Sequence, residues 1–289
     1  MTDRPQSLAD LIGVYLAEQC TVITDAEPQL RAGENVVHVT RVAVRRLRST
    51  IRVFGELFDV AKAGLLEEEV VWCAGLLGAV RDLDILQASL TERIAGLPPE
   101  LVLGPVESTI QTEIATQRKI GMDAVTAAMD SERYRKLVAL IHAWRSDPPF
   151  TDAAAAPARE VSRYVKRAEK KVTKRLAAAV AAREAADDGD EDGDELFHRA
   201  RKAGKRHRYA VEATVPLWGS RAEKVVAARK DLQDVLGHHQ DRIVQGAFLR
   251  ELGARLGVRS GQNGFTYGVL YSEVVAADKT LVADLKPFL

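Results

Sequence analysis

Two short segments of the chain carry histidine, arginine and lysine at spacings that suit the binding of an anion. The first segment reads His38-x-x-Arg41-x-x-x-Arg45-Arg46-x-Arg48, with Arg52 one helical turn further on. The second segment reads His198-x-x-Arg201-Lys202-x-x-Lys205-Arg206-x-Arg208. Steps of three and four residues place such side chains in one row on a helix. The planar guanidinium group suits paired contacts with phosphate oxygens, so these residues predict a site for a phosphorylated anion.

Neither basic segment contains an acidic residue. No Asp or Glu occurs between Asn35 and Gly55, and none occurs between Leu196 and Val211. Solvated helix faces usually mix charges of both signs, and a row of like charges repels itself. We therefore favour an anionic ligand for both rows; the alternative is an ordinary solvated face.

The charge of the whole chain hides this basic character. The 289 residues include 41 Lys and Arg and 41 Asp and Glu, so the formal net charge is zero. Eight of the acidic residues lie in the segment 184–195, which contains no basic residue and two glycines. The other 277 residues carry 41 basic against 33 acidic side chains. Like-charge repulsion and glycine predict that residues 184–195 form an extended, solvated linker.

Other residues are candidates for supporting roles. The basic run 159–175 predicts outer contacts with the anion at Arg163, Lys170 and Lys174, although a plain basic surface helix is an equally simple interpretation. We predict a further outer contact at His239. The carboxylates of Asp82 and Asp241 could accept hydrogen bonds from the histidines at the start of each row and so fix their orientation. The alternative for both is helix capping or a surface salt bridge.

Long helices must hold these rows. Apolar residues recur with a helical period, no segment alternates with a period of two, and turn residues separate the segments. We expect an all-α protein of helical bundles, with helices near residues 7–31, 35–58, 64–91, 105–129, 132–145, 157–184, 195–217, 220–256 and 265–284. On the second of these, a separate apolar row should face the core: Val44, Leu47, Ile51, Phe54 and Phe58. His207 occupies the position that matches Leu47, so we interpret it as a core histidine.

The two basic segments belong to an internal repeat. Their matched positions are all 160 residues apart. Each is followed by a second motif, Leu77-Gly78-Ala79-Val80-Arg81-Asp82 or Leu236-Gly237-His238-His239-Gln240-Asp241, and this pair is offset by 159 residues. Two motifs in the same order at almost one offset indicate duplicated halves. We place these halves at residues 1–149 and 150–289 and expect each to be a helical bundle.

Motifs typical of enzymes, metal sites and membrane segments are not found in the sequence. It contains no phosphate-binding loop, no Gly-x-Ser-x-Gly and no His-Glu-x-x-His. Cys20 and Cys73 alone cannot form a zinc site or a disulfide framework. No apolar run approaches the roughly 20 residues of a membrane span. We expect a cytoplasmic binding protein that uses no catalytic residue, metal or other cofactor and does not bind membranes.

The doubled His/Arg motif and the two Leu-Gly motifs resemble the CHAD domain, the conserved histidine α-helical domain, over nearly the whole chain. The resemblance implies two four-helix bundles related by approximate two-fold symmetry, with basic helices that line a positively charged groove. It also implies that this groove binds inorganic polyphosphate through residues at the matched positions. The matches are His38, Arg41, Arg45, Arg48, His198, Arg201, Lys205 and Arg208. One departure is Glu212, which stands at the position that matches Arg52.

Polyphosphate, and with it polyphosphate granules in the cell, is the partner that we favour. Nucleic acid is the alternative, because duplex DNA also demands rows of basic residues. Proteins that bind nucleic acid usually add side chains that read or stack on bases, and Tyr209 is the one aromatic residue in the rows. A third, weaker hypothesis is a phosphohydrolase acting on short polyphosphate.

Overall fold

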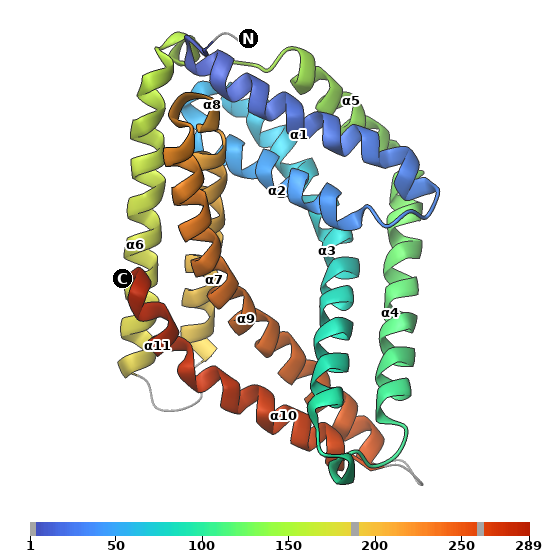
Figure 1. Ribbon diagram of the computed structural model, residues 1–289. Helices are drawn as coiled ribbons and strands as arrows, with labels where there is room; N and C mark the ends of the chain where they lie inside the picture. Colours follow the sequence, from blue (N-terminus) through green and yellow to red (C-terminus); the bar gives the residue numbers. More distant parts are fainter. Residues whose placement is uncertain (1–3, 186–190, 259–262) are drawn as a thin grey trace. The chain divides into compact units, whose positions relative to one another are not determined.

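The chain folds into α-helices joined by short turns and 3-10 segments (Figure 1). This computed structural model describes residues 4–185, 191–258 and 263–289, and those ranges contain no β-strand. The prediction of an all-α fold is confirmed. The helices are α1 (Leu8–Arg31), α2 (Val37–Val53), α3 (Val60–Gly96), α4 (Val106–Met129), α5 (Glu132–Ser146), α6 (Val161–Ala185), α7 (Glu191–Glu212), α8 (Val215–Trp218), α9 (Ser220–Gly257), α10 (Phe265–Ala277) and α11 (Leu281–Leu285).

The predicted helix boundaries agree closely where turn residues mark them. Those of α4, α5 and α9 differ from the structure by one residue at most. The second helix is shorter than predicted, because the chain leaves α2 at Val53 and continues through a 3-10 turn at Gly55–Leu57. No helix in the described ranges combines the length and the apolar composition that a bilayer-spanning segment requires.

The predicted extended linker at residues 184–195 is wrong at both of its ends. Helix α6 continues to Ala185, and α7 already begins at Glu191. Acidic residues stabilise the first turns of a helix, where the backbone carries partial positive charge. Asp194 also accepts a hydrogen bond of 2.7 Å from Arg183 of α6, and Glu195 pairs with Arg199 one turn further along α7. The middle of the predicted linker, residues 186–190, lies outside the described residues.

The helices form two compact units, and each unit takes segments from both ends of the chain. Unit 1 comprises Met1–Gly78 and Ala124–Gln233, and unit 2 comprises Ala79–Asp123 and Asp234–Leu289. Helices α1, α2, α5, α6, α7 and α8 therefore belong to unit 1, whereas α10 and α11 belong to unit 2. The duplication into residues 1–149 and 150–289 concerns the sequence, and it stays a prediction.

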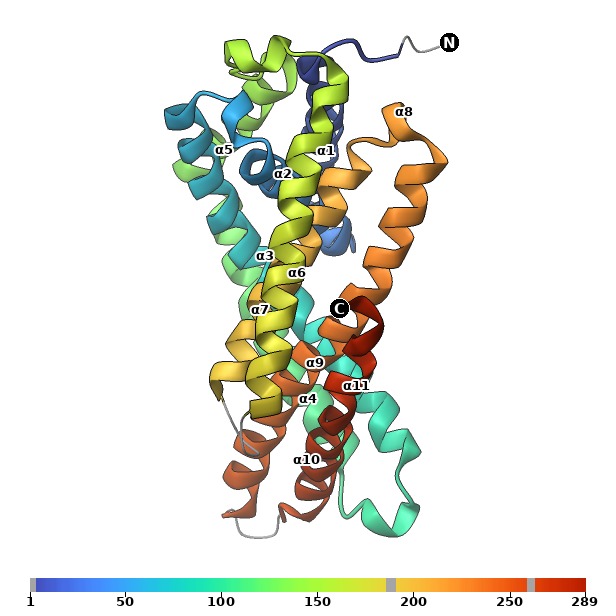
Figure 2. The same ribbon diagram turned by 90° about the vertical axis from the view of Figure 1, so that its left-hand side faces the viewer.

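The core of unit 1 fixes the orientation of α2. Helix α1 packs against α2 and α5 (Figure 1), and α7 packs against α2 and α6 (Figure 2). The apolar row of α2 is buried as predicted, with Val44, Leu47, Ile51 and Phe54 each at most 4% exposed. Burying one such side chain stabilises a fold by about 1.5–3 kcal/mol. This packing turns the basic row of α2 away from the core.

The buried histidine of α7 behaves as a core residue, as the sequence predicted. His207 is 1% exposed, and its Nδ1 accepts a hydrogen bond of 3.2 Å from Nε of Arg229 on α9. Burial, followed by the charge of Arg229, lowers the pKa of His207 to about 4. The ring is therefore neutral at physiological pH and takes its hydrogen bond as an acceptor.

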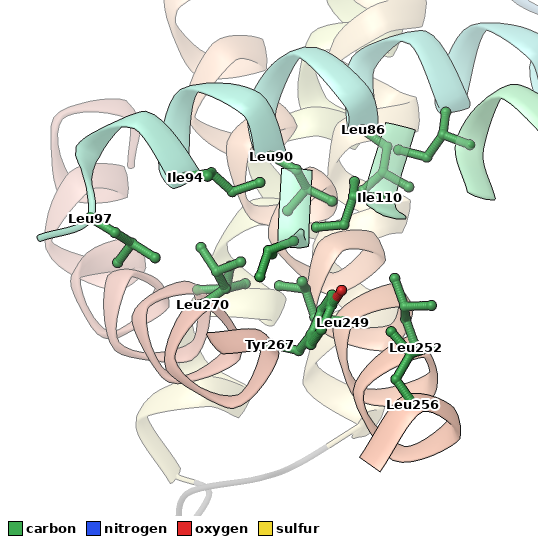
Figure 3. Packing of buried hydrophobic residues seen from close by; sticks show 13 residues of the cluster. Leu86, Leu90, Ile94, Leu97, Ile110, Leu249, Leu252, Leu256, Tyr267 and Leu270 are labelled. Atoms are coloured by element: carbon green, nitrogen blue, oxygen red, sulfur yellow. The ribbon is translucent and has the colours of Figure 1, made fainter. Parts of the chain in front are cut away.

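The core of unit 2 is a separate apolar cluster. Leucine side chains of α3 and α9 meet α4 and α10 there, with Leu90, Ile110, Leu249, Tyr267 and Leu270 among its members (Figure 3). Each of these five side chains is at most 4% exposed. The cluster gives the distal parts of α3 and α9 their own packing partners within unit 2.

Candidate anion-binding site

Helices α2 and α7 bring the two basic rows together within unit 1. The ammonium group of Lys205 on α7 lies close to four guanidinium groups, whose charges act on it together. They belong to Arg41 and Arg45 of α2 and to Arg201 and Arg208 of α7. We call these five residues the Lys205 cluster. The sequence predicted all five, and the structure gathers residues 160 positions apart around one amine.

The electrostatics of the Lys205 cluster are unfavourable while no anion is bound. Burial, followed by the charges of Arg201, Arg45, Arg41 and Arg208, lowers the pKa of Lys205 from 10.5 to about 6. No carboxylate forms an ion pair with Lys205 or Arg45 in the part of the chain that the structure describes. An unneutralised charge in such a place is costly. A multivalent anion would remove this cost.

Hydrogen-bond donors in the Lys205 cluster also lack acceptors. Nε of Arg45 and Nε of Arg208 are buried, and neither finds a hydrogen-bond partner among the described residues. A buried donor without a partner costs about 1–3 kcal/mol. Phosphate oxygens accept hydrogen bonds from guanidinium groups with good geometry. The unmet donors and the unbalanced charge therefore call for the same kind of ligand.

A pocket of about 310 Å³ contains the other end of the α2 row. Arg52 of α2 and Arg206 of α7 line it together with three bases of α6, which are Arg167, Lys171 and Arg175. We call this the Arg206 pocket. Glu67 bonds Nε of Arg52 and lies 3.2 Å from Nε of Arg48, so the end of the α2 row is partly neutralised.

Comparisons with known proteins identify the family of this chain. The model of the CHAD domain family matches residues 14–250 of the chain. The chain belongs to this family. The proteins Rv2226 and MT2285 of two Mycobacterium tuberculosis strains, both named as uncharacterized, are each 30% identical to it over 270 residues. The match covers 93% of this chain and 50% of each relative, so this chain spans about half their length.

Solved structures show the same fold. The crystal structure of the CHAD domain from the plant Ricinus communis superposes with a TM-score of 0.73 at 25% identity, over 98% of this chain and 92% of that one. PptA from Streptomyces chartreusis superposes with a TM-score of 0.77 at 20% identity, over 98% of both chains. The likeness to PptA concerns the fold alone. The sequence resemblance to CHAD domains is thus confirmed.

Arg46 serves the packing of this CHAD domain. Its Nε donates a hydrogen bond of 2.8 Å to Glu212 of α7, and its guanidinium lies over the ring of Tyr209 at 5.7 Å. Glu212 also accepts a hydrogen bond of 3.1 Å from the hydroxyl of Tyr15 and lies 3.7 Å from Arg208. The acid that breaks the second basic row therefore ties α7 to α1 and α2. The structure places Arg46, which we predicted as a ligand contact, in this tie and not in the Lys205 cluster.

Removing the charge of Glu212 should destabilise this CHAD domain. Glu212→Gln leaves Arg46 and Arg208 without their half-buried counter-charge, so we expect a loss of about 1–3 kcal/mol in the free energy of unfolding. Urea titration followed by circular dichroism measures it. Glu195→Gln, which breaks an exposed pair with Arg199, is the control and should leave the free energy of unfolding nearly unchanged. Equal losses in the two variants would contradict the structural role of Glu212.

The basic face of α6 differs in register from the predicted one. Lys170 and Lys174 are exposed and do not line the Arg206 pocket. Arg163 donates to the hydroxyl of Tyr164 at 2.7 Å and lies at the edge of the pocket, 4.0 Å from Glu56. The bases of α6 that line the pocket are instead Arg167, Lys171 and Arg175. Their steps of four residues beside the apolar Tyr164 and Ala168 were the signal that could have identified this face.

The remaining predicted residues are not members of the Lys205 cluster and do not line the Arg206 pocket. His38 is exposed in the first turn of α2, His198 is half-buried on α7 and Lys202 is exposed. His239 was predicted as an outer contact, but its ring is 2% exposed and its Nδ1 lies 2.7 Å from Asp278. An outer contact needs an accessible ring, so we assign His239 to the packing of unit 2. Asp82 and Asp241 also belong to unit 2, and their supporting role stays a prediction.

Proposed function

We propose that this CHAD domain binds inorganic polyphosphate at the Lys205 cluster. The observation that carries the proposal is the gathering of four guanidinium groups around one lysine, whose pKa burial and then their charges lower to about 6. A linear polyanion presents one negative charge at each phosphate unit, so it can contact several of these bases at once. Neutralising them would also release bound counterions, which favours binding at low salt.

The surroundings of the Lys205 cluster favour polyphosphate over nucleic acid. Proteins that bind single strands offer exposed aromatic rings on which bases stack. Tyr209, the one aromatic residue of the basic rows, is 1% exposed and lies under Arg208 at 4.9 Å. Its ring therefore supports the arginine and offers no face to a base. Nucleic acid remains the alternative partner.

We propose a binding role without catalysis. Enzymes that cleave phosphoanhydrides use carboxylates to hold Mg²⁺ at the reacting phosphate. Glu212, the carboxylate that lies 3.7 Å from Arg208 of the Lys205 cluster, is already engaged by Arg46, Arg208 and Tyr15. Binding without cleavage would suit a protein that attaches to polyphosphate granules in the cytoplasm.

A competition titration tests the choice of ligand. Labelled long-chain polyphosphate is bound to the protein and then displaced with unlabelled polyphosphate, duplex DNA or single-stranded RNA, followed by fluorescence anisotropy. We expect both nucleic acids to need more than about ten times the phosphate concentration that polyphosphate needs. Displacement at equal phosphate concentration would favour the nucleic-acid alternative. Release of phosphate from tripolyphosphate in the presence of Mg²⁺ would contradict the absence of catalysis.

A further inference from the structure

The Arg206 pocket differs from the Lys205 cluster in its walls. Bases line it from three helices, and Val53, Ala168 and Ala203 add an apolar surface. Its volume of about 310 Å³ lies at the small end of the range for small-molecule sites. One molecule of liquid water occupies about 30 Å³, and a phosphate ion is only a few times larger. The pocket therefore has more space than one phosphate ion fills. The pocket suits a discrete small ligand with a charged and an apolar part.

The charge of the Arg206 pocket is strongly positive. Five bases line it against one lining carboxylate, Glu56, which already bonds Arg167 at 2.5 Å. Glu67 pairs with a second of the bases, Arg52, so Arg206, Lys171 and Arg175 carry the excess positive charge. Arg206 forms no ion pair with a carboxylate among the residues that the structure describes. Burial, followed by the charges of Arg52, Arg175 and Arg48, lowers the pKa of Arg206 to about 10. Arg206 therefore keeps its charge at neutral pH, at an electrostatic cost that an anion would relieve.

We propose that the Arg206 pocket binds the di- or triphosphate group of a small molecule, with Arg206, Arg175 and Lys171 as the contacts to phosphate. The rest of such a molecule would lie against the apolar wall. This site goes beyond the binding of long polyphosphate at the Lys205 cluster and depends on different residues. A nucleoside triphosphate and inorganic tripolyphosphate share the recognised group, and the experiment separates them.

Calorimetric titration of the full chain with ATP and with tripolyphosphate tests the proposal. The titrations use a Lys205→Met, Arg45→Gln background, which disables the Lys205 cluster. We expect one molecule of triphosphate to bind per chain in this background. Arg175→Gln and Lys171→Gln should each weaken that binding about tenfold. Lys166→Gln removes an exposed charge of the same helix outside the pocket, and it should change the affinity by less than about twofold.

The outcomes separate this proposal from the binding of long polyphosphate. Tighter binding of ATP identifies an organic phosphate as the ligand, whereas tighter binding of tripolyphosphate identifies an inorganic one. No binding of either probe in the double-variant background overturns the pocket proposal, as do equal effects of Arg175→Gln and Lys166→Gln. Lys171 is exposed, so its replacement tests the pocket even if Arg175→Gln disturbs folding. A failure of long polyphosphate to bind the parent protein concerns only the Lys205 cluster.

Discussion

Lys205→Met should stabilise the anion-free protein and weaken its binding of long polyphosphate at the same time. Methionine keeps the length of the lysine side chain and removes the amine that four guanidinium groups surround. Most substitutions at a half-buried position destabilise a fold, so a gain in stability here would be specific to the electrostatics of the Lys205 cluster.

The gain in stability follows from the pKa of Lys205. Between about pH 6 and pH 10 the unfolded chain holds a proton on this lysine that the folded chain has released, so the lysine favours unfolding and stability rises with pH. One pKa unit corresponds to about 1.4 kcal/mol. We expect Lys205→Met to raise the free energy of unfolding by at least about 1.5 kcal/mol at pH 7, and Tm by about 3 °C. Thermal unfolding followed by circular dichroism measures both.

The loss of binding has the opposite cause. Bound polyphosphate would restore the proton on Lys205 and accept hydrogen bonds from it, and a charged hydrogen bond contributes about 1.5–3 kcal/mol. We expect Lys205→Met to bind long polyphosphate about 10- to 100-fold more weakly. Lys224→Met, an exposed lysine of α9 in the same unit, is the control and should change neither quantity. A lower Tm for Lys205→Met, or unchanged affinity, would refute this account of the cluster.

The affinity for long polyphosphate should increase as the pH falls towards 6. Lys205 in the free protein is largely neutral above pH 6, because burial and the charges of four arginines lower its pKa to about 6. A bound polyanion raises the pKa of this amine, so binding takes up a proton between pH 6 and the higher pKa of the complex. Below about pH 6 both states hold the proton, and the affinity should level off.

Calorimetry in two buffers with different ionisation enthalpies measures this proton uptake directly. Lys205→Arg keeps a permanent charge, since arginine is protonated at all these values, and should bind with little dependence on pH. A His38→Gln, His198→Gln double variant removes the two histidines that head the basic rows and should retain most of the uptake. If uptake disappears in this double variant and persists in Lys205→Arg, the histidines and not Lys205 carry the linkage.

The sequence predicts best those features that depend on one helix at a time. The basic and apolar rows of α2 follow from steps of three and four residues, and so does the burial of His207 at the position that matches Leu47. The duplicated motif further indicated that Lys205 and Arg45 belong to one site. Such features are local or repeated, so their pattern is visible in the chain itself.

Features that depend on contacts between helices could not be predicted in the same way. The pair of Arg46 with Glu212 joins residues 166 positions apart, and no spacing rule links them. The register of α6 in the Arg206 pocket depends on how that helix rolls against its neighbours, which favoured Lys171 over Lys170. Like-charge repulsion and glycine predicted an extended segment at residues 184–195, although acids at the start of α7 stabilise that helix.

The low pKa of Lys205 gives the proposed site a threshold for the valence of its ligand. A monovalent anion that meets one guanidinium gains one contact and offsets little of the repulsion that a proton on Lys205 would meet from the four arginines. An anion that touches several of these bases at once spreads the same cost over many contacts. The site should therefore bind chloride and single phosphate ions only weakly at cellular concentrations, whereas it should bind long polyphosphate chains. Discrimination by valence then needs no narrow channel, because the free energy required to protonate Lys205 is enough to provide it.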